Sequence, residues 1–422
     1  MNSLESWIAD HPVVDVHEHH LPELVGASEV DLLRIFQQSY AGWTQARPYP
    51  LPSESRNEDP MLGQASATSW EALQPYLENS GSSMFVRNLV SGLTELYACD
   101  DRKITSTNWH HLDEQIRTHH RNPNWRQEVI CRANIWHLIT DAYSAPLLDA
   151  RSALGDNYSS VVRMNAFAFG WHCDSRDHNG NSAHQLLESR QLETDTFEHY
   201  LESIATLVET LPQYNQVAIK NALAYDRSLD FLPATRAQAK AAWGMENPSP
   251  EAKKHFGDYI VDHFCELCGH HDLPMQMHLG TALIRDSHPL KVAPLVERHP
   301  KTRFLLMHLA YPWSRDLLGM AFVYRNIWID LTWSALLSPS HFKLALHEAI
   351  DVLPDDSRMM FGGDNWHIEE TYATIRTFRR LIAEVLSEKV EQGAFDEEHA
   401  KQLASRILSQ NATRFFKLPL GD

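Results

Sequence analysis

Cysteine, basic charge and long apolar runs are all scarce in this chain of 422 residues. Its five cysteines are too few and too irregularly spaced to predict a disulfide framework. No stretch approaches the length of a membrane-spanning helix, and the first residues lack the basic region and apolar run of a signal peptide. We therefore expect a soluble cytoplasmic protein in a reducing compartment.

Basic residues are outnumbered, with 37 lysines and arginines against 55 acidic residues and a formal net charge of −18. The basic residues are dispersed along the chain, so they form no electrostatic footprint for nucleic acid or an anionic membrane surface. We expect a small-molecule substrate, no nucleic-acid or membrane partner, and leave homo-oligomer formation open. The length and the apolar fraction of 43% allow one large barrel-type domain or two smaller ones.

Cys265 and Cys268 have the spacing of half a zinc ribbon, but no second cysteine pair completes four ligands. They lie at the end of an apolar-periodic stretch, over residues 259–267. We therefore predict two core thiols on a helix rather than a metal site.

Short apolar runs recur along the chain, with room for a helix between most of them. The predicted strands are residues 12–16, 135–140, 161–167, 216–220, 274–278, 303–308, 327–330 and 358–361. The predicted helices are residues 194–211, 249–268, 290–299, 313–324 and 340–352. Eight strand–helix units in one chain imply an α/β fold, a closed (β/α)8 TIM barrel.

Two segments extend this barrel. Residues from about 21 to 125 have mixed composition and no alternating runs, and they are too long for a plain connection, so we predict a helical insertion after strand 1. The chain from about residue 368 onward is predicted to be a helical C-terminal segment. We expect residues 1–422 to form a single domain that includes both segments.

Polar side chains stand at the carboxyl ends of the predicted strands, where the active sites of such barrels lie. His17 and His19 end the first strand, and alternation along a strand projects them to the same side. Neutral imidazole is the commonest metal ligand in proteins. Further polar residues follow strands four, five, six and eight, namely Lys220, His278, His308 and Asp364. The joint pattern predicts a metal site at this rim.

In this order and spacing, the set resembles the amidohydrolase superfamily of metal-dependent barrels, and within it the amidohydrolase-2 branch with its FluG-like and decarboxylase-like members. The resemblance spans nearly the whole chain apart from the insertion. The motifs that carry it are DVHEH at 15–19, AIK at 218–220, AYDR at 224–227, MH at 277–278, LLMHLAYPW at 305–313, FGGDN at 361–365 and NATRF at 411–415.

The resemblance implies that His17, His19 and Asp364 bind a divalent metal, with His278 as a further ligand. His308 would be either a ligand of a second metal or a general acid. Zinc suits these ligands best, with manganese, iron and nickel as alternatives and one or two ions in the site. A bound water of lowered pKa would attack the substrate, Asp364 would accept its proton, and His308 would stabilise the oxyanion.

Lys220 has two competing roles. In binuclear members of the superfamily, a lysine at the end of strand four is carboxylated and bridges two metals. The alternative, which the FluG-like resemblance around residues 220–227 favours, is an uncarboxylated lysine that binds or polarises a substrate carboxylate. Besides these two functional roles, a structural lysine that only extends its charged end to solvent is a smaller third option. A guanidinium and aromatic side chains after the strand ends predict a pocket for a carboxylate-bearing substrate. The residues assigned to substrate binding are Arg227, Tyr225, Trp313 and Trp366.

The resemblance thus predicts a metal-dependent hydrolase that cleaves an amide, ester or lactone with metal-activated water. A non-hydrolytic metal-dependent decarboxylase and a sugar-acid isomerase similar to uronate isomerases are the alternatives among enzymes. The alternative from another class is a barrel that serves as a non-catalytic binding module.

Overall fold

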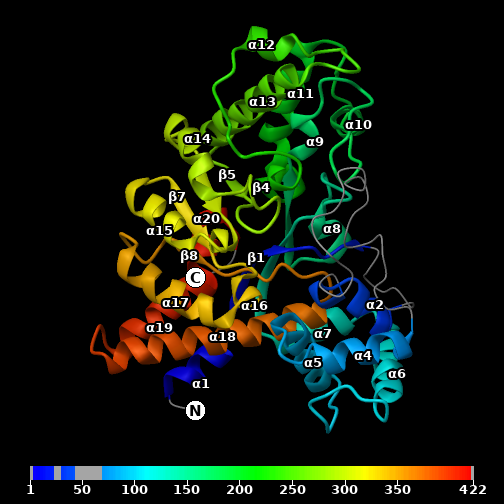
Figure 1. Ribbon diagram of the computed structural model, residues 1–422, viewed down its shortest axis with the longest axis vertical. Helices are drawn as coiled ribbons and strands as arrows, with labels where there is room; N and C mark the ends of the chain where they lie inside the picture. Colours follow the sequence, from blue (N-terminus) through cyan, green and yellow to red (C-terminus); the bar gives the residue numbers. More distant parts are fainter. Residues whose placement is uncertain (1–2, 23–29, 43–68, 420–422) are drawn as a thin grey trace. The chain divides into compact units, whose positions relative to one another are not determined.

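The computed structural model describes residues 3–22, 30–42 and 69–419 (Figure 1). Eight strands form one sheet in the order β1 to β8, which is the predicted (β/α)8 barrel. From β3 to β8, each strand pairs with the next in parallel. The strands are β1 (Val13–Glu18), β2 (Ile135–Thr140), β3 (Tyr158–Arg163), β4 (Gln216–Asn221), β5 (Pro274–Met277), β6 (Arg303–Leu306), β7 (Ile327–Asp330) and β8 (Met359–Met360).

Several predicted strand ends differ from the structure, most clearly those of β3 and β8. The apolar run at 161–167 does not stay extended, because β3 ends at Arg163 and α9 (Asn165–Ala168) follows at once. Asn165 uses both ends of its side-chain amide there: its oxygen accepts from Ala222 N and its nitrogen donates to Asp226. The last strand, β8, has only two residues instead of the four predicted.

By its internal contacts the chain divides into two compact units, each made of separate segments. The first unit comprises residues 1–138, 332–347 and 361–410, and the second comprises residues 139–331, 348–360 and 411–422. The single domain expected from the sequence stays a prediction.

In the first unit, the predicted helical insertion is confirmed over its described residues. The helices between β1 and β2 include α2 (Leu32–Gln37), α4 (Trp70–Asn79), α5 (Met84–Leu96), α6 (Trp109–His120) and α7 (Trp125–Arg132). Local capping starts two of them, because Asp31 accepts from the backbone N–H of Arg34 and Ser69 from that of Ala72.

The predicted helical C-terminal segment is also confirmed. The other helices of the first unit are α1 (Ser3–Asp10), α16 (Ser334–Leu337), α18 (Ile368–Glu391) and α19 (Glu397–Ser405), and α17 (Pro339–Val352) begins there. The long helix α18 packs against α1, α5 and α7. Its approach to α5 requires a glycine, since a Cβ on Gly92 would lie 2.4 Å from the Cβ of Ala373.

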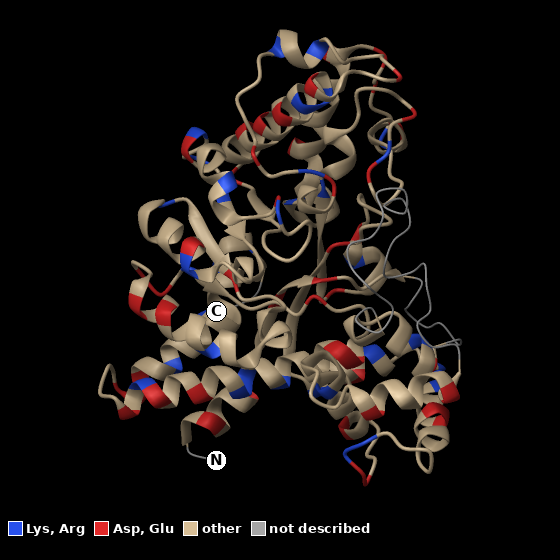
Figure 2. Cartoon of the chain, viewed as in Figure 1, with Lys and Arg blue, Asp and Glu red and all other residues tan. Residues whose placement is uncertain are grey.

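The second unit surrounds β3 to β8 with further helices. They are α8 (Ala150–Leu154), α9, α10 (Ala183–Ser189), α11 (Phe197–Thr210), α12 (Arg236–Lys240), α13 (Pro250–His271), α14 (Ala293–Arg298), α15 (Ser314–Val323) and α20 (Asn411–Phe416). Cys265 and Cys268 lie on α13 and are completely buried, which confirms that they are core thiols on a helix. Acidic and basic side chains are spread over many helices (Figure 2). Among the described residues, no helix combines the length and apolar character needed to cross a membrane.

Candidate metal centre

Strand β1 positions the two histidines of the predicted metal site. All six residues of β1 are buried, and His17 lies within the strand while His19 follows its end. Their imidazole rings are both buried and meet edge to face, with centroids 4.9 Å apart. The projection of both histidines to one side of the strand, predicted from alternation, therefore holds.

Asp364 reaches the same place from the loop after β8. Its backbone N–H donates to the carbonyl of His17 at 2.8 Å, and its positive φ of 68° turns the chain there. Carboxylate Oδ1 of Asp364 lies 3.0 Å from Nε2 of His19 and 3.6 Å from Nε2 of His17. One ligand atom of each residue lies within 4.8 Å of the others, and all three side chains are buried. Two imidazoles and a carboxylate at this spacing suit a divalent transition metal such as zinc.

Tyr40 is a site residue that the sequence reasoning missed. Its hydroxyl donates to Oδ2 of Asp364 at 2.9 Å, so the two carboxylate oxygens have different surroundings. Its ring packs against three aromatic rings, those of Phe85, Trp333 and Trp366, at centroid distances of 4.7 to 5.3 Å. Tyr40 belongs to the insertion, where no motif or strand end distinguishes it in the sequence.

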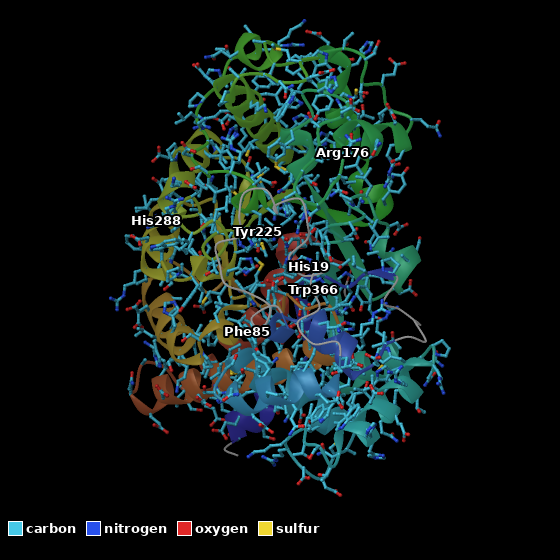
Figure 3. All side chains as sticks on the ribbon, turned by 45° about the vertical axis from the view of Figure 1, so that its right-hand side comes forward. His19, Phe85, Arg176, Tyr225, His288 and Trp366 are labelled. Carbon is cyan, nitrogen blue, oxygen red and sulfur yellow. The ribbon has the colours of Figure 1, made fainter. Side chains whose placement is uncertain are left out.

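Trp366, one of the predicted substrate-binding residues, lies next to His19 of the metal cluster. Its indole stacks on the imidazole of His19 with centroids 4.9 Å apart, and Figure 3 shows the two side by side. The indole Nε1 of Trp366 is buried and has no hydrogen-bond partner among the described residues. A buried donor of this kind is costly unless a ligand or water accepts its hydrogen bond.

The carboxyl groups of Asp15 and Glu18 hold together the two segments that carry the predicted metal ligands. Asp15 accepts hydrogen bonds from the backbone N–H groups of His17 and Gly363, at 3.1 and 3.0 Å. Glu18 accepts from the backbone N–H and from Nδ2 of Asn365. Burial and the neighbouring Asp15 carboxylate raise the pKa of Glu18 well above its usual range. Glu18 thus joins β1 to the loop that carries Asp364.

Glu369 ties the insertion to the first turn of α18. Its Oε1 accepts hydrogen bonds from the Tyr97 hydroxyl, His120 Nε2 and Trp125 Nε1, at 2.7 to 3.1 Å. Burial alone would raise the pKa of Glu369, but His120 and the other donors hold it well below its usual range. An ionised carboxylate therefore holds the ends of α5, α6 and α7 at the helix that begins beside Trp366.

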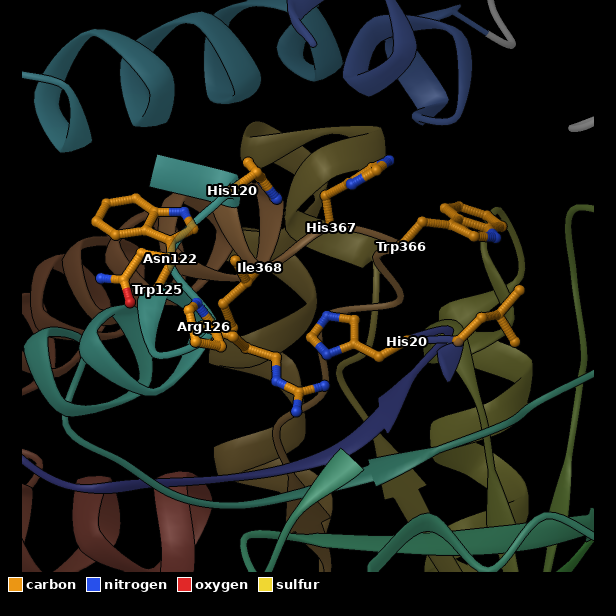
Figure 4. A pocket seen from close by; sticks show the side chains of 10 residues that line it. His20, His120, Asn122, Trp125, Arg126, Trp366, His367 and Ile368 are labelled. Atoms are coloured by element: carbon orange, nitrogen blue, oxygen red, sulfur yellow. The ribbon is translucent and has the colours of Figure 1, made fainter. Parts of the chain in front are cut away.

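A cavity of about 30 Å³ lies beside His120 and Trp125. It has room for about one or two water molecules. Figure 4 shows the side chains of His20 and Arg126 close together at this cavity. Burial lowers the pKa of His20 to about 3, so its imidazole is neutral at physiological pH, and Nε2 hydrogen-bonds the Thr371 hydroxyl at 2.9 Å. The other buried side chains that line the cavity include His120, Trp125, Trp366 and His367.

Known proteins match both the sequence and the fold. A family model described as an amidohydrolase matches residues 233–418. Protein fluG of Emericella nidulans is 28% identical over 151 residues, a match that covers 34% of this chain but only 17% of fluG. The structure is similar to that of a glucuronate isomerase from Caulobacter crescentus, with a TM-score of 0.72, 15% identity and 99% and 94% of the two chains covered.

A protein named as a metal-dependent hydrolase, from Lactobacillus casei, matches with a TM-score of 0.68 and 17% identity over 99% of this chain and 98% of its own. Residues 233–418, a little less than half of this chain, are thus similar in sequence to an amidohydrolase family. At these identities, the two solved structures support the fold, whereas the family model and fluG support the superfamily.

The remaining residues that the amidohydrolase resemblance implies lie in the second compact unit. His278 Nε2 lies 3.3 Å from the carbonyl oxygen of Thr281. Nδ1 of His278 and Nε2 of His308 share a hydrogen bond of 2.9 Å. His308 begins three residues with positive φ and its N–H donates to Asp330 Oδ1, so the surrounding fold holds a strained turn in place. The roles of His278 as a ligand and His308 as an acid stay predictions.

Lys220 and Tyr225 contact the two segments that carry His308 and His278, respectively. Lys220 is buried within β4, and its Nζ contacts the sulfur of Met307 at 2.6 Å. The ring of Tyr225 lies 4.5 Å from that of His278, centroid to centroid. Whether Lys220 is carboxylated, and whether Tyr225 binds substrate, stay predictions.

The other two predicted substrate-binding residues have neighbours of their own. The Arg227 guanidinium pairs with the buried Asp258 of α13 at 2.6 Å and lies over the ring of Phe231. Trp313 is half-buried, and its ring lies 4.8 Å from that of His288, centroid to centroid. The Asp258 pair gives Arg227 a structural partner that the sequence did not indicate.

Proposed function

We propose that this protein is a metal-dependent hydrolase of a small, carboxylate-bearing amide, ester or lactone. The observation that carries the proposal is the buried cluster of His17, His19 and Asp364. The Tyr40 hydroxyl donates a hydrogen bond to Oδ2 of this aspartate. A bound divalent ion, for which zinc fits the donor set best, would supply a water of lowered pKa and a Lewis acid. Cytoplasmic location is part of the same proposal.

Three side chains near the proposed ion, those of Asp364, Tyr40 and Trp366, would have separate roles. Asp364, whose Oδ2 accepts from the Tyr40 hydroxyl, would take a proton from the attacking water and return it to the leaving group. Tyr40 fixes which way the carboxylate faces. The buried Nε1 of Trp366 offers a hydrogen bond to a substrate oxygen.

Four residues of the second compact unit have proposed roles that come from the superfamily motifs. We assign His278 as a further metal ligand, His308 to the negative charge that develops on the substrate, and Lys220, uncarboxylated, to the substrate carboxylate. Tyr225 would contribute an aromatic wall. These roles rest on the superfamily motifs at 218–220, 277–278 and 305–313.

Hydrolysis is tested with the zinc-loaded protein on a panel of carboxylate-bearing lactones, esters and amides in water enriched in oxygen-18. We expect turnover that disappears after chelation, returns with metal and places one solvent oxygen in the product. Product without solvent oxygen, or a substrate converted without a change in mass, would instead indicate a decarboxylase or an isomerase. Activity indifferent to metal would overturn the proposal.

A further inference from the structure

A groove of about 520 Å³ runs along α18 in the first compact unit. Helices α1 and α5 both pack against α18 (Figure 1). Side chains of all three helices line the groove, among them Glu5, Ala9, Ser91, Arg376, Arg379 and Arg380. None of the ligands His17, His19 and Asp364 is among them.

Arg379 is a buried cation without a counter-ion in this groove. It is 6% exposed, and among the described residues it makes no ion pair. The two other arginines buried to a similar degree in the described chain both have carboxylate partners, Arg163 with Asp141 and Arg358 with Asp355. A buried charge of either sign is costly unless an opposite charge offsets it.

The hydrogen bonds of Arg379 leave this charge unbalanced. Its Nη2 donates to the carbonyl of His11, just after the end of α1, and its Nε is buried with no hydrogen-bond partner among the described residues. Burial lowers the pKa of Arg379 to about 10, with only a partial opposing effect from Asp10. The guanidinium is still charged at physiological pH, so it needs an anion rather than a proton acceptor.

Arg376 lies three residues before Arg379, one helical turn away, and Arg380 follows Arg379 directly; both also line the groove. Both are more exposed and currently paired, Arg376 with Glu95 and Arg380 with Glu384. Exposed ion pairs contribute little free energy, and long side chains exchange such partners readily. Arg376 and Arg380 can therefore turn toward an anion held by Arg379.

We propose that this groove binds a small oxyanion, the phosphate or carboxylate group of a metabolite, through Arg379 with Arg376 and Arg380 at its sides. Guanidinium groups suit such ligands because their planar donors match two oxygens at once. With one uncompensated cation, the groove matches a ligand group of one or two negative charges rather than a polyanion. Its volume leaves space for the rest of a small molecule over the short side chains of Ala9 and Ser91.

The competing explanation is purely structural: Arg379 would only fix the carbonyl end of α1. The two explanations differ in what substitutions do to anion binding. Arg379→Gln removes the charge, whereas Ala9→Phe keeps every charge and fills the groove from the exposed face of α1. A structural Arg379 would make the first variant less stable and leave the second without effect on any ligand.

Isothermal titration calorimetry on the zinc-loaded full-length protein, at constant ionic strength in sodium chloride, tests the proposal with inorganic phosphate and separately with succinate. We expect saturable binding of at least one of them, persisting after chelation of the metal. Arg379→Gln and Ala9→Phe should each weaken it about tenfold or more. The control Arg315→Gln, which removes an exposed arginine paired with Glu348, should stay within about twofold.

Binding of phosphate alone would assign the groove to phosphate esters, and binding of succinate alone to carboxylates. The proposal is overturned if neither anion binds saturably, or if binding is unchanged in Ala9→Phe. Should Arg379→Gln not fold, Arg380→Gln on the exposed side of α18 and Ala9→Phe still decide the question, because both leave the buried arginine in place.

Discussion

The hydroxyl of Tyr40 is the residue-level feature that most directly shapes the candidate site. Tyr40→Phe removes the donor to Asp364 Oδ2 and keeps the ring against Trp333 and Trp366. Because hydrogen-bond partners of a metal ligand orient that ligand, we expect turnover to fall about 10- to 100-fold. The amount of bound metal should stay close to that of the wild type. Steady-state kinetics and metal analysis of the purified variant measure both quantities.

The matched control is Tyr324→Phe, which removes a hydroxyl that donates to Glu297 and leaves the metal cluster untouched. Its kinetics should equal those of the wild type. Full activity in Tyr40→Phe would show that the hydrogen bond to Asp364 has no part in turnover.

Single residues differ in how visible they are in a sequence. His17, His19 and Asp364 could be predicted because each follows an apolar run, and strand alternation fixes their direction. Tyr40 could not, because its position depends on how the insertion folds back on the loop after β8. Asp258, the partner of Arg227, was equally invisible, since only packing of α13 brings the two side chains together.

At the scale of elements, the loop from β8 to α18 has almost no spare room. A Cβ on Gly363 would lie 2.3 Å from Glu18 Oε1 and 2.4 Å from Asn365 Nδ2. Gly363→Ala should therefore displace Asp364 and weaken metal binding at least about tenfold, because the ligand set depends on sub-ångström positions. Competition with a fluorescent zinc chelator measures the affinity.

Gly81→Ala is the control for this substitution, because a Cβ there meets nothing within 4 Å. Its zinc affinity should match that of the wild type. An unchanged affinity in Gly363→Ala would mean that the loop adapts without moving the carboxylate of Asp364.

The first turn of α18 carries a buried acid whose protonation should be measurable. Burial raises the pKa of Glu370 to about 8, although the backbone N–H groups of His367 and Trp366 oppose the shift. The folded state thus binds a proton that the unfolded state has released above about pH 4.5, and its stability falls as pH rises from there to about 8.

Glu370→Gln keeps an oxygen for both backbone N–H groups and removes the titration. Its free energy of unfolding, relative to the wild type, should therefore rise with pH between about 4.5 and 8 and level off above. Chemical denaturation at several pH values checks this, with the exposed Glu398→Gln as the control that shows no such trend. A flat difference for Glu370→Gln would place the pKa of this carboxyl near its usual value.

Elements were predictable where the apolar pattern has only one interpretation. Strands β2 and β7 have the predicted bounds, and Ser249 caps α13 where a helix start was expected. The run at 161–167 failed because an apolar stretch does not distinguish a buried strand from a buried helix. Asn165 decides it through hydrogen bonds to Ala222 and Asp226, which are distant in sequence.

At the scale of the whole molecule, the barrel followed from repetition, since eight alternating units leave few other topologies. The composition of the compact units could not be predicted in this way, because the first unit joins residues 1–138 to two later segments. Such pairings depend on side-chain packing between α18 and the insertion, such as the Glu369 hydrogen bonds, and they have no periodic signature.

The metal cluster joins two of those segments, β1 and the loop after β8, so metal binding should stabilise the fold. A ligand that binds only the folded state adds about 4 kcal/mol when its free concentration is about a thousand times Kd. We expect calorimetric melting of the zinc-loaded protein at a clearly higher temperature than after chelation. Asp364→Asn should abolish that difference. Asp195→Asn, in the exposed group of Glu193, Asp195 and His199, should preserve it. Equal melting temperatures with and without zinc would mean that the three ligands hold no metal in the folded chain, and a shift lost in Asp195→Asn instead would place the stabilising ion at the surface.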